Sequence, residues 1–186
     1  MIQTITIIGF LLWLLIYWQG GRRAVADIRH AASGLDAALM LVIAGGTMVI
    51  AAGGLALLLG LIEAPVGSLT AILGLLLTAT GIGGTLYARH YLGRFWTAEA
   101  VVQEGHQVVD TGPYALVRHP IYAAAILLYL GLGLTLNASW FWIAVASVVA
   151  AYAWKTRLED RLLEAELPGY QAYRRKTRYM LIPGIW

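Results

Sequence analysis

Long runs without a charged residue dominate the hydrophobic pattern of this 186-residue chain. Four such runs cover residues 1–21, 37–62, 64–88 and 121–154, and each is longer than the roughly 18 residues that mark a candidate membrane span. The last run is too long for one span, and Asn137 near its middle supplies a polar turn. The pattern therefore predicts an all-α integral membrane protein with about five transmembrane helices, of which the last two form a tight helical hairpin.

Polar segments separate these runs and organise the rest of the chain. The turn at residues 63–67 is short, so the second and third spans, expected at about 35–60 and 68–88, are predicted to be antiparallel neighbours. Residues 89–120 form a long polar connector with two short β-prone runs, which fits either a hairpin or a strap. Connections of this length tend to be functional.

The C-terminal tail holds much of the charge. Leucines recur at helical spacing between residues 158 and 163, so the last span is expected to continue past the membrane until the Pro-Gly pair at 168–169 ends it. Beyond that pair, Tyr170, Tyr173 and the basic residues 174–178 predict a C-terminal amphipathic helix on anionic headgroups. The expected partners of this segment are therefore membrane lipids.

Composition and charge agree with a membrane protein, because 60% of the residues are hydrophobic and only 12% are charged. A soluble domain carries about twice that charged fraction, so an ordinary cytosolic fold and a disordered chain are excluded. The 13 Lys and Arg residues lie within residues 22–29, 89–118 and 155–178, at alternate ends of successive spans. By the positive-inside rule this predicts a multi-pass protein with its N-terminus outside and its C-terminus in the cytoplasm. It also accounts for the net charge of +3 without a nucleic-acid partner.

The side-chain inventory narrows the possible chemistry. The chain has no cysteine, which excludes disulfides, thiolate metal sites and cysteine nucleophiles. It also has no His-Glu-x-x-His or comparable spacing, so no metal is expected. His30, His90 and His106 stand alone in loops, which favours a structural or solvated role for each.

One cluster of candidate residues enters the fourth span, in the segment GPYALVRHPIY at residues 112–122. Pro120 fits the first turn of a helix, whose amides and partial positive charge suit a carboxylate or a phosphate. Arg118 adds a bidentate anion donor, while His119 and Tyr122 share one helix face. The cluster therefore suggests a site for an anionic group at the membrane boundary.

A second cluster lies where the last span leaves the membrane. Here Glu159 and Asp160 can bind a cationic group, whereas Lys155 and Arg157 can bind an anionic one. Ionisable groups close to a membrane point to function. From the residues alone, however, both clusters fit equally well as charges that merely flank the spans.

The two clusters together resemble a known family. The run V-x-x-GPY-x-x-x-RHP-x-Y, followed by a helical hairpin, an acidic pair, Tyr-x-x-Tyr and a terminal Leu-Ile-Pro, is similar to the isoprenylcysteine carboxyl methyltransferases and the related phospholipid methyltransferases. The likeness covers residues 85–186. It implies one domain overall, in which transmembrane helices 1–3 at residues 1–84 precede a methyltransferase catalytic region at 85–186 made of the connector, the hairpin and the C-terminal helix.

The resemblance also implies S-adenosylmethionine as the cofactor, bound on the cytoplasmic side under the connector. It assigns Glu159 to the amino group of the cofactor, with Asp160 in place of the family's second Glu, and it leaves open whether Lys155 or Arg157 faces a substrate carboxylate. Lys155, Arg157 and Glu159 are thus the expected catalytic residues. The expected cofactor-binding residues are Gly112, Pro113, Tyr114, Arg118, His119, Tyr122, Glu159 and Asp160.

The resulting hypothesis is a membrane-embedded methyltransferase that uses S-adenosylmethionine. Carboxyl O-methylation of a prenylcysteine-like or other lipophilic acceptor, small or prenylated, is the leading interpretation. A carboxylate is already ionised at neutral pH, so it needs positioning and desolvation instead of a strong base. The alternatives are phospholipid amine N-methylation, thiol S-methylation, an NADPH-dependent membrane reductase and a non-catalytic membrane protein.

Overall fold

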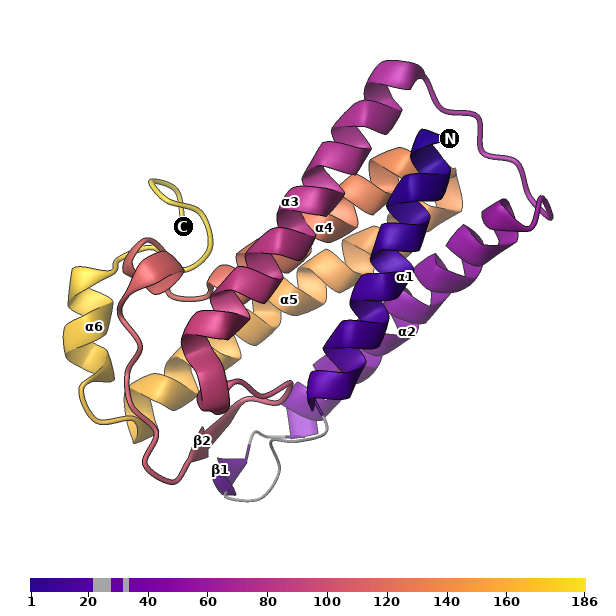
Figure 1. The fold of residues 1–186 in the computed structure, drawn as a ribbon. Coiled ribbons are helices and arrows are strands. Elements are labelled where there is room, and N and C mark those ends of the chain that lie inside the picture. The colour runs from indigo at the N-terminus through magenta and orange to yellow at the C-terminus, as the bar shows by residue number, and fades with distance from the viewer. Residues whose placement is uncertain (22–27, 32–33) are drawn as a thin grey trace.

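A computed structural model of the protein describes residues 1–21, 28–31 and 34–186 (Figure 1). Most of the basic loop expected after the first helix, residues 22–27, lies outside the described residues. The described residues form six α-helices, two short 3₁₀ helices at Gly93–Phe95 and Gly112–Ala115, and one two-stranded sheet. The α-helices are α1 (Ile2–Gly21), α2 (Gly34–Leu58), α3 (Ser68–Leu92), α4 (Pro120–Leu136), α5 (Ser139–Glu166) and α6 (Tyr170–Lys176).

The architecture is a helical bundle, and its functional parts gather at one end. Figure 1 shows the connector, α6 and the C-terminal segment at the end of the bundle away from the N-terminus and the loop between α2 and α3. The all-helical fold class expected from the sequence is confirmed, with the short sheet added. The helix bounds agree with the charge-free runs because those runs set where polar residues permit a turn.

Two helices, Gly34–Leu58 and Ser68–Phe95, are long and apolar enough to cross a membrane. The apolar helices Ile2–Tyr17 and Pro120–Leu136 are shorter. The outer faces of the bundle carry large apolar side chains, among them Leu41, Met48 and Ile143, which are 74%, 72% and 72% exposed. Such a surface suits lipid and not water. The count of five spans and their orientation stay predictions.

Helices α3 and α4 pack through a seam of small residues. A side chain on Gly81 would bring its Cβ within 2.5 Å of the backbone nitrogen of Leu128, and one on Gly131 would come equally close to the nitrogen of Thr78. Small residues of this kind let membrane helices approach closely. The seam therefore fixes α4, whose N-terminal end carries the first candidate cluster, against α3.

The tight hairpin predicted for the last apolar run is confirmed. Helix α4 ends at Leu136, and Asn137 takes the left-handed conformation with φ 45° while its N–H donates to the Gly133 carbonyl. Helix α5 begins two residues later and extends to Glu166, well past the apolar run. The Pro-Gly pair at 168–169 then separates it from α6, as expected.

The connector is a strap and not a hairpin. Its strand β2 (Val101–Gln103) pairs antiparallel with β1 (Ile28–Ala31), which comes from the segment after α1. The second β-prone run, at residues 108–109, is not a strand. The hairpin alternative is therefore wrong, because the first run finds its partner in a distant segment and the second run instead lines a cavity.

Helix α6 forms as predicted, and its aromatic face packs against the protein. Tyr170 and Tyr173 are only 3% and 6% exposed, and they pack with Trp96, Tyr114 and Ile121 in a small core beside the main one. The expectation that these tyrosines rest on lipid headgroups is wrong. The same spacing of apolar residues serves a protein core as well as a bilayer surface.

Candidate active site

A cavity of about 570 Å³ lies among the helices and the connector. This volume is within the range of pockets that hold a small molecule or cofactor. The connector contributes residues 95–98, 101 and 106–109 to its wall. The aromatic rings in the wall are those of Trp13, Tyr17, Phe95, Trp96, Tyr114, Tyr122, Tyr129, Tyr152, Tyr170 and Tyr173.

The wall of the cavity differs from one helix to another. Helix α2 contributes only uncharged side chains, from Met40 to Ala51. The start of α4 and the C-terminal half of α5 contribute the charged ones, namely Arg118, Lys155 and Glu159. The cavity thus joins an apolar compartment among the membrane helices to a polar one at the end of the bundle.

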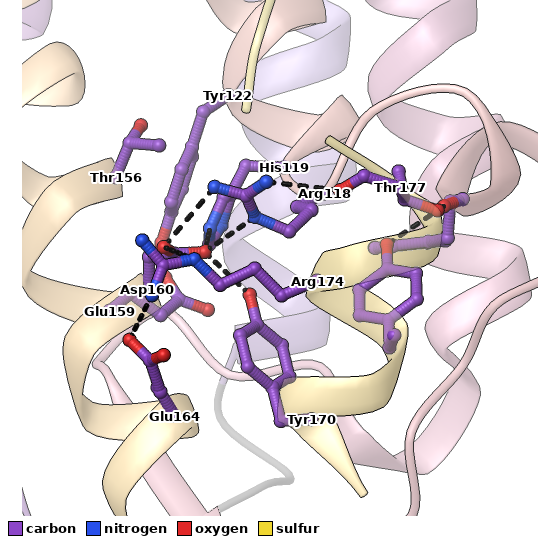
Figure 2. Close-up of polar contacts among 12 residues, drawn as sticks. Arg118, His119, Tyr122, Thr156, Glu159, Asp160, Glu164, Tyr170, Arg174 and Thr177 are labelled. Atoms are coloured by element: carbon purple, nitrogen blue, oxygen red, sulfur yellow. Dashed lines mark hydrogen bonds and ion pairs between the residues drawn. The ribbon is translucent and has the colours of Figure 1, made fainter. Parts of the chain in front are cut away.

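Arg118 and Asp160 form a buried ion pair at the polar side of this cavity (Figure 2). The Arg118 Nε donates to Asp160 Oδ1 at 2.8 Å and its Nη2 to Oδ2 at 3.3 Å. The remaining Nη1 donates to the carbonyls of Thr177 and Arg178, at 3.0 and 2.6 Å. The guanidinium therefore joins α4, α5 and the C-terminal segment.

Asp160 is the centre of this network. Its Oδ1 also accepts the Tyr170 hydroxyl proton at 2.8 Å and lies 3.3 Å from His119 Nε2. Burial opposes its charged form, but hydrogen bonds from His119 and Arg118 outweigh burial and hold the pKa of this carboxyl well below its usual range. Asp160 thus stays ionised and compensated, with α6 held against it.

The C-terminal segment and α6 add further hydrogen bonds to this network. The backbone amides of Arg118 and His119 donate to the carbonyls of Tyr179 and Met180, at 2.9 and 3.0 Å. The Tyr173 hydroxyl donates to the Tyr114 carbonyl at 2.8 Å. These bonds fix the segment that precedes α4, and with it the ring of His119.

Three of the residues expected at the cofactor come together at the cavity. The Tyr122 hydroxyl donates to Glu159, and the rings of His119 and Tyr122 are parallel to within 5° with centroids 5.8 Å apart (Figure 2). Glu159 lines the cavity and forms no ion pair within the described part of the chain. Among the described residues it is therefore a carboxylate without an ion-pair partner, whereas the neighbouring Asp160 is fully paired.

The two expected substrate-facing cations lie in different places. Lys155 lines the cavity and is only 1% exposed, and its Nζ pairs with Asp36 of α2. Arg157 is exposed and lies over the ring of Trp186 at 4.8 Å, away from the residues that line the cavity. Of the two, Lys155 is the one at the cavity. Sequence reasoning missed Asp36, whose only signal was a lone acid at the start of a span.

The GPY segment forms the 3₁₀ helix at Gly112–Ala115, and Tyr114 lines the cavity. Gly112 has a φ of 57°, and a Cβ there would collide with the ring of Tyr91. Pro113 follows in the first turn and accepts the Val117 amide at 3.3 Å. Gly112 and Pro113 therefore fix the backbone ahead of Tyr114 without lining the cavity themselves, and their role at a cofactor stays a prediction.

His106 lines the cavity, although the sequence favoured only a structural or solvated role for this loop histidine. Its ring stacks on Phe95, with centroids 4.6 Å apart. Its Nδ1 is buried and has no hydrogen-bond partner among the described residues. Burial lowers the pKa of His106, and Arg94 adds to that effect while Glu159 opposes it. Nothing in its loop sequence separated it from His90.

These features define a helical membrane protein with a cofactor-sized cavity at one end, where a fixed RHP-x-Y segment meets an acidic residue of α5. A family model described as phospholipid methyltransferase matches residues 69–167, which is more than half of the chain. The chain belongs to the phospholipid methyltransferase family, and the resemblance found in the sequence is confirmed.

Curated relatives carry names that refer to metal resistance. The chain is 35% identical over 109 residues to the cobalt-zinc-cadmium resistance protein CzcN of Cupriavidus metallidurans, covering 55% of this chain and 47% of that protein. It is 32% identical over 108 residues to the nickel-cobalt-cadmium resistance protein NccN of Alcaligenes xylosoxydans xylosoxydans, with the same coverage. The chain spans about half the length of the curated relatives it matches.

Proposed function

We propose that this protein transfers a methyl group from S-adenosylmethionine, bound in the cavity, to a lipophilic acceptor within the membrane. The family supports methyltransferase activity. The observation that carries the proposal is the Glu159 carboxylate, which has no ion-pair partner in the part of the chain that the structure describes and lies beside Tyr122 and His119 in an aromatic cavity that continues into an apolar compartment.

The charges of the cavity fit this cofactor. S-adenosylmethionine carries a sulfonium, an ammonium and a carboxylate, so its net charge of one positive complements Glu159, the one carboxylate among the described lining residues. Aromatic rings in the wall, including Tyr114 and Tyr170, suit its cationic groups and its base. When bound, it supplies a methyl group whose bond to sulfur breaks, with the electron pair staying on sulfur, as the acceptor's lone pair forms the new bond.

The residues of this chain contribute binding, orientation and exclusion of water. Glu159 holds the amino end of the cofactor, and the rings of His119 and Tyr122 bound the pocket beside it. The Arg118–Asp160 ion pair holds the start of α4 against α5. Methyl transfer needs in-line positioning in a dry site more than a strong base, and the apolar wall of α2 supplies such surroundings.

The acceptor is proposed to enter from the bilayer between α1 and α2. Leu15 of α1 and Met48 of α2 both line the cavity and are 61% and 72% exposed. Apolar side chains that line the cavity and remain exposed suit the entry of a lipophilic molecule at this place. The cofactor would enter from the opposite, polar side, which the positive-inside distribution of charge assigns to the cytoplasm.

Two acceptor chemistries are candidates. The sequence resemblance favours carboxyl O-methylation of a prenylcysteine-like molecule, with Lys155 as the cation that faces the carboxylate. The pairing of Lys155 with Asp36 favours the second candidate, methylation of an amine or a thiol.

Calorimetry on the purified full chain tests the proposal. S-adenosylmethionine and its demethylated product are both expected to bind, and radiolabelled methyl groups should pass to members of a panel of prenylated carboxylates, amino-lipids and lipophilic thiols. Base-labile product would identify an ester, and base-stable product an N- or S-methyl group. Failure of the wild-type protein to bind either form of the cofactor would refute the proposal. Oxidation of NADPH with an unsaturated lipid would instead support the reductase alternative.

A further inference from the structure

We propose that Asp36 is a specificity-determining residue: by neutralising Lys155 it keeps acceptors with a carboxylate at the reacting end out of the cavity. This inference rests on the proposed function and deepens it. It concerns a part of the chain that the family match does not include, because Asp36 precedes the matched residues 69–167 while Lys155 lies within them.

The geometry of the pair leaves Lys155 no free charge to offer. Its side chain and that of Asp36 are 1% and 2% exposed, and Lys155 Nζ contacts Asp36 Oδ1. The other carboxylate oxygen of Asp36 accepts the backbone amide of Ala100 at 3.2 Å. Asp36 lies in the first turn of α2, where the helix dipole favours a negative charge. The pair therefore joins α2, α5 and the connector as one neutral unit.

The other charged side chains that the structure describes in the cavity wall also leave no cation free to meet an acceptor carboxylate. Arg118 is the other Lys or Arg side chain among the described lining residues, and Asp160 compensates it. His119 also lies against Asp160. Of the charged side chains that the structure describes in this wall, Glu159 alone has no ion-pair partner, so these side chains and their partners together carry one net negative charge. A cofactor with one net positive charge balances that charge.

A carboxylate acceptor would add an unpaired negative charge to this neutral, largely apolar site. Burying an unpaired charge is costly, and the cost rises as the surroundings become less polar. An acceptor without charge at its reacting end does not carry this free-energy cost. The pairing of Asp36 with Lys155 thus decides which acceptors are tolerated, since removing the Asp36 charge would leave a cation free to meet a carboxylate.

The experiment compares two probes of equal shape, a farnesyl thioether that ends in a carboxylate and the corresponding carboxamide. Binding of each to the full chain is measured by calorimetry in the presence of the demethylated cofactor. The wild-type protein is expected to prefer the carboxamide. Asp36→Asn should shift the ratio of affinities at least tenfold toward the carboxylate, because the amide keeps the size of the side chain and can still accept from the Ala100 amide.

Asp110→Asn is the matched control, since Asp110 pairs with Lys176 on the exposed surface and does not line the cavity. It should leave the ratio unchanged. Where Asp36→Asn does not fold, the double variant Asp36→Asn, Lys155→Met removes both charges and should keep the wild-type preference for the carboxamide. Equal affinities for the two probes in the wild type, or an unchanged ratio in a folded Asp36→Asn protein, would overturn the inference. Failure of the wild-type protein to bind the cofactor would instead overturn the proposed function. Failure of the specificity inference and failure of the proposed function are therefore distinguishable.

Discussion

Replacing Glu159 with glutamine removes the one lining charge that has no ion-pair partner among the described residues, and it changes little else. The Tyr122 hydroxyl donates to this side chain, and a glutamine oxygen can accept the same bond. The neighbouring Asp160 network does not include Glu159, so α4, α5 and α6 keep their mutual contacts. Any change in cofactor affinity therefore reports the lost charge.

The size of the effect follows from the hydrogen bond that the carboxylate is proposed to make. A hydrogen bond to a charged group contributes about 1.5–3 kcal/mol. With about 1.4 kcal/mol for each factor of ten, Glu159→Gln should weaken the binding of S-adenosylmethionine roughly 10- to 150-fold. The demethylated product lacks the sulfonium charge, so its affinity should fall by a smaller factor.

Calorimetry on both ligands measures this directly. Glu164→Gln is the control, because it makes the same charge change on the same helix, but Glu164 pairs with Arg174 and does not line the cavity. It should bind both ligands as the wild type does. Wild-type affinity in Glu159→Gln, or an equal loss in Glu164→Gln, would refute the assignment of the cofactor's amino end to Glu159.

Other predictions concern the helix packing and hydrogen bonds that support the site, and the pH dependence of cofactor binding. Gly81→Ala should destabilise the protein by about 1–3 kcal/mol, because its Cβ would lie 2.5 Å from a backbone nitrogen of α4, whereas Gly83→Ala meets open space and should not. Cofactor affinity should decrease as the pH is lowered from about 6.5. The lowered pKa of His106 keeps its ring neutral at pH 7, and protonation in acid adds a positive charge beside a cationic cofactor. Tyr170→Phe should cost about 1.5–3 kcal/mol, because its lost hydrogen bond is to the ionised Asp160.

Each of these predictions has its own measurement. Thermal unfolding in detergent compares the two glycine variants. Equal melting temperatures would contradict the claim that Gly81 is needed for the close packing of α3 and α4. Calorimetry between pH 5.5 and pH 8 follows cofactor affinity, and the dependence should flatten in His106→Gln. An unchanged profile in that variant would remove His106 from the explanation. Chemical unfolding measures Tyr170→Phe, with Tyr179→Phe as the control, because Tyr179 is 40% exposed.

The helices could be predicted because a charge-free run has few alternatives to a helix in a membrane. The second span was expected at 35–60 and is Gly34–Leu58, and the hairpin turn was placed at Asn137. What the pattern could not supply is the partner of each charge at a helix end. Asp36 and Lys155 are 119 residues apart, and each looks like an ordinary flanking charge until α2 and α5 are placed side by side.

Tyr114, His119 and Tyr122, which the local motif singled out, line the cavity, whereas the sequence alone could not separate neighbours that helix geometry turns apart. Glu159 and Asp160 look like one acidic pair in the sequence. Successive residues of an α-helix point about 100° apart, so Glu159 faces the cavity while Asp160 faces Arg118 and Tyr170. Reading the pair as a unit therefore hides the fact that only one of the two acids is available to a ligand.

Two buried ion pairs in the cavity wall have a meaning beyond stability. Removing a charge pair from water costs several kcal/mol for each ion, and a well-packed apolar pair of similar volume is often as stable or more so. Stability alone therefore gives little reason for Arg118–Asp160 and Asp36–Lys155 to be buried beside a cavity of about 570 Å³. Their common effect is electrostatic, because together they leave Glu159 as the one lining charge without an ion-pair partner among the described residues.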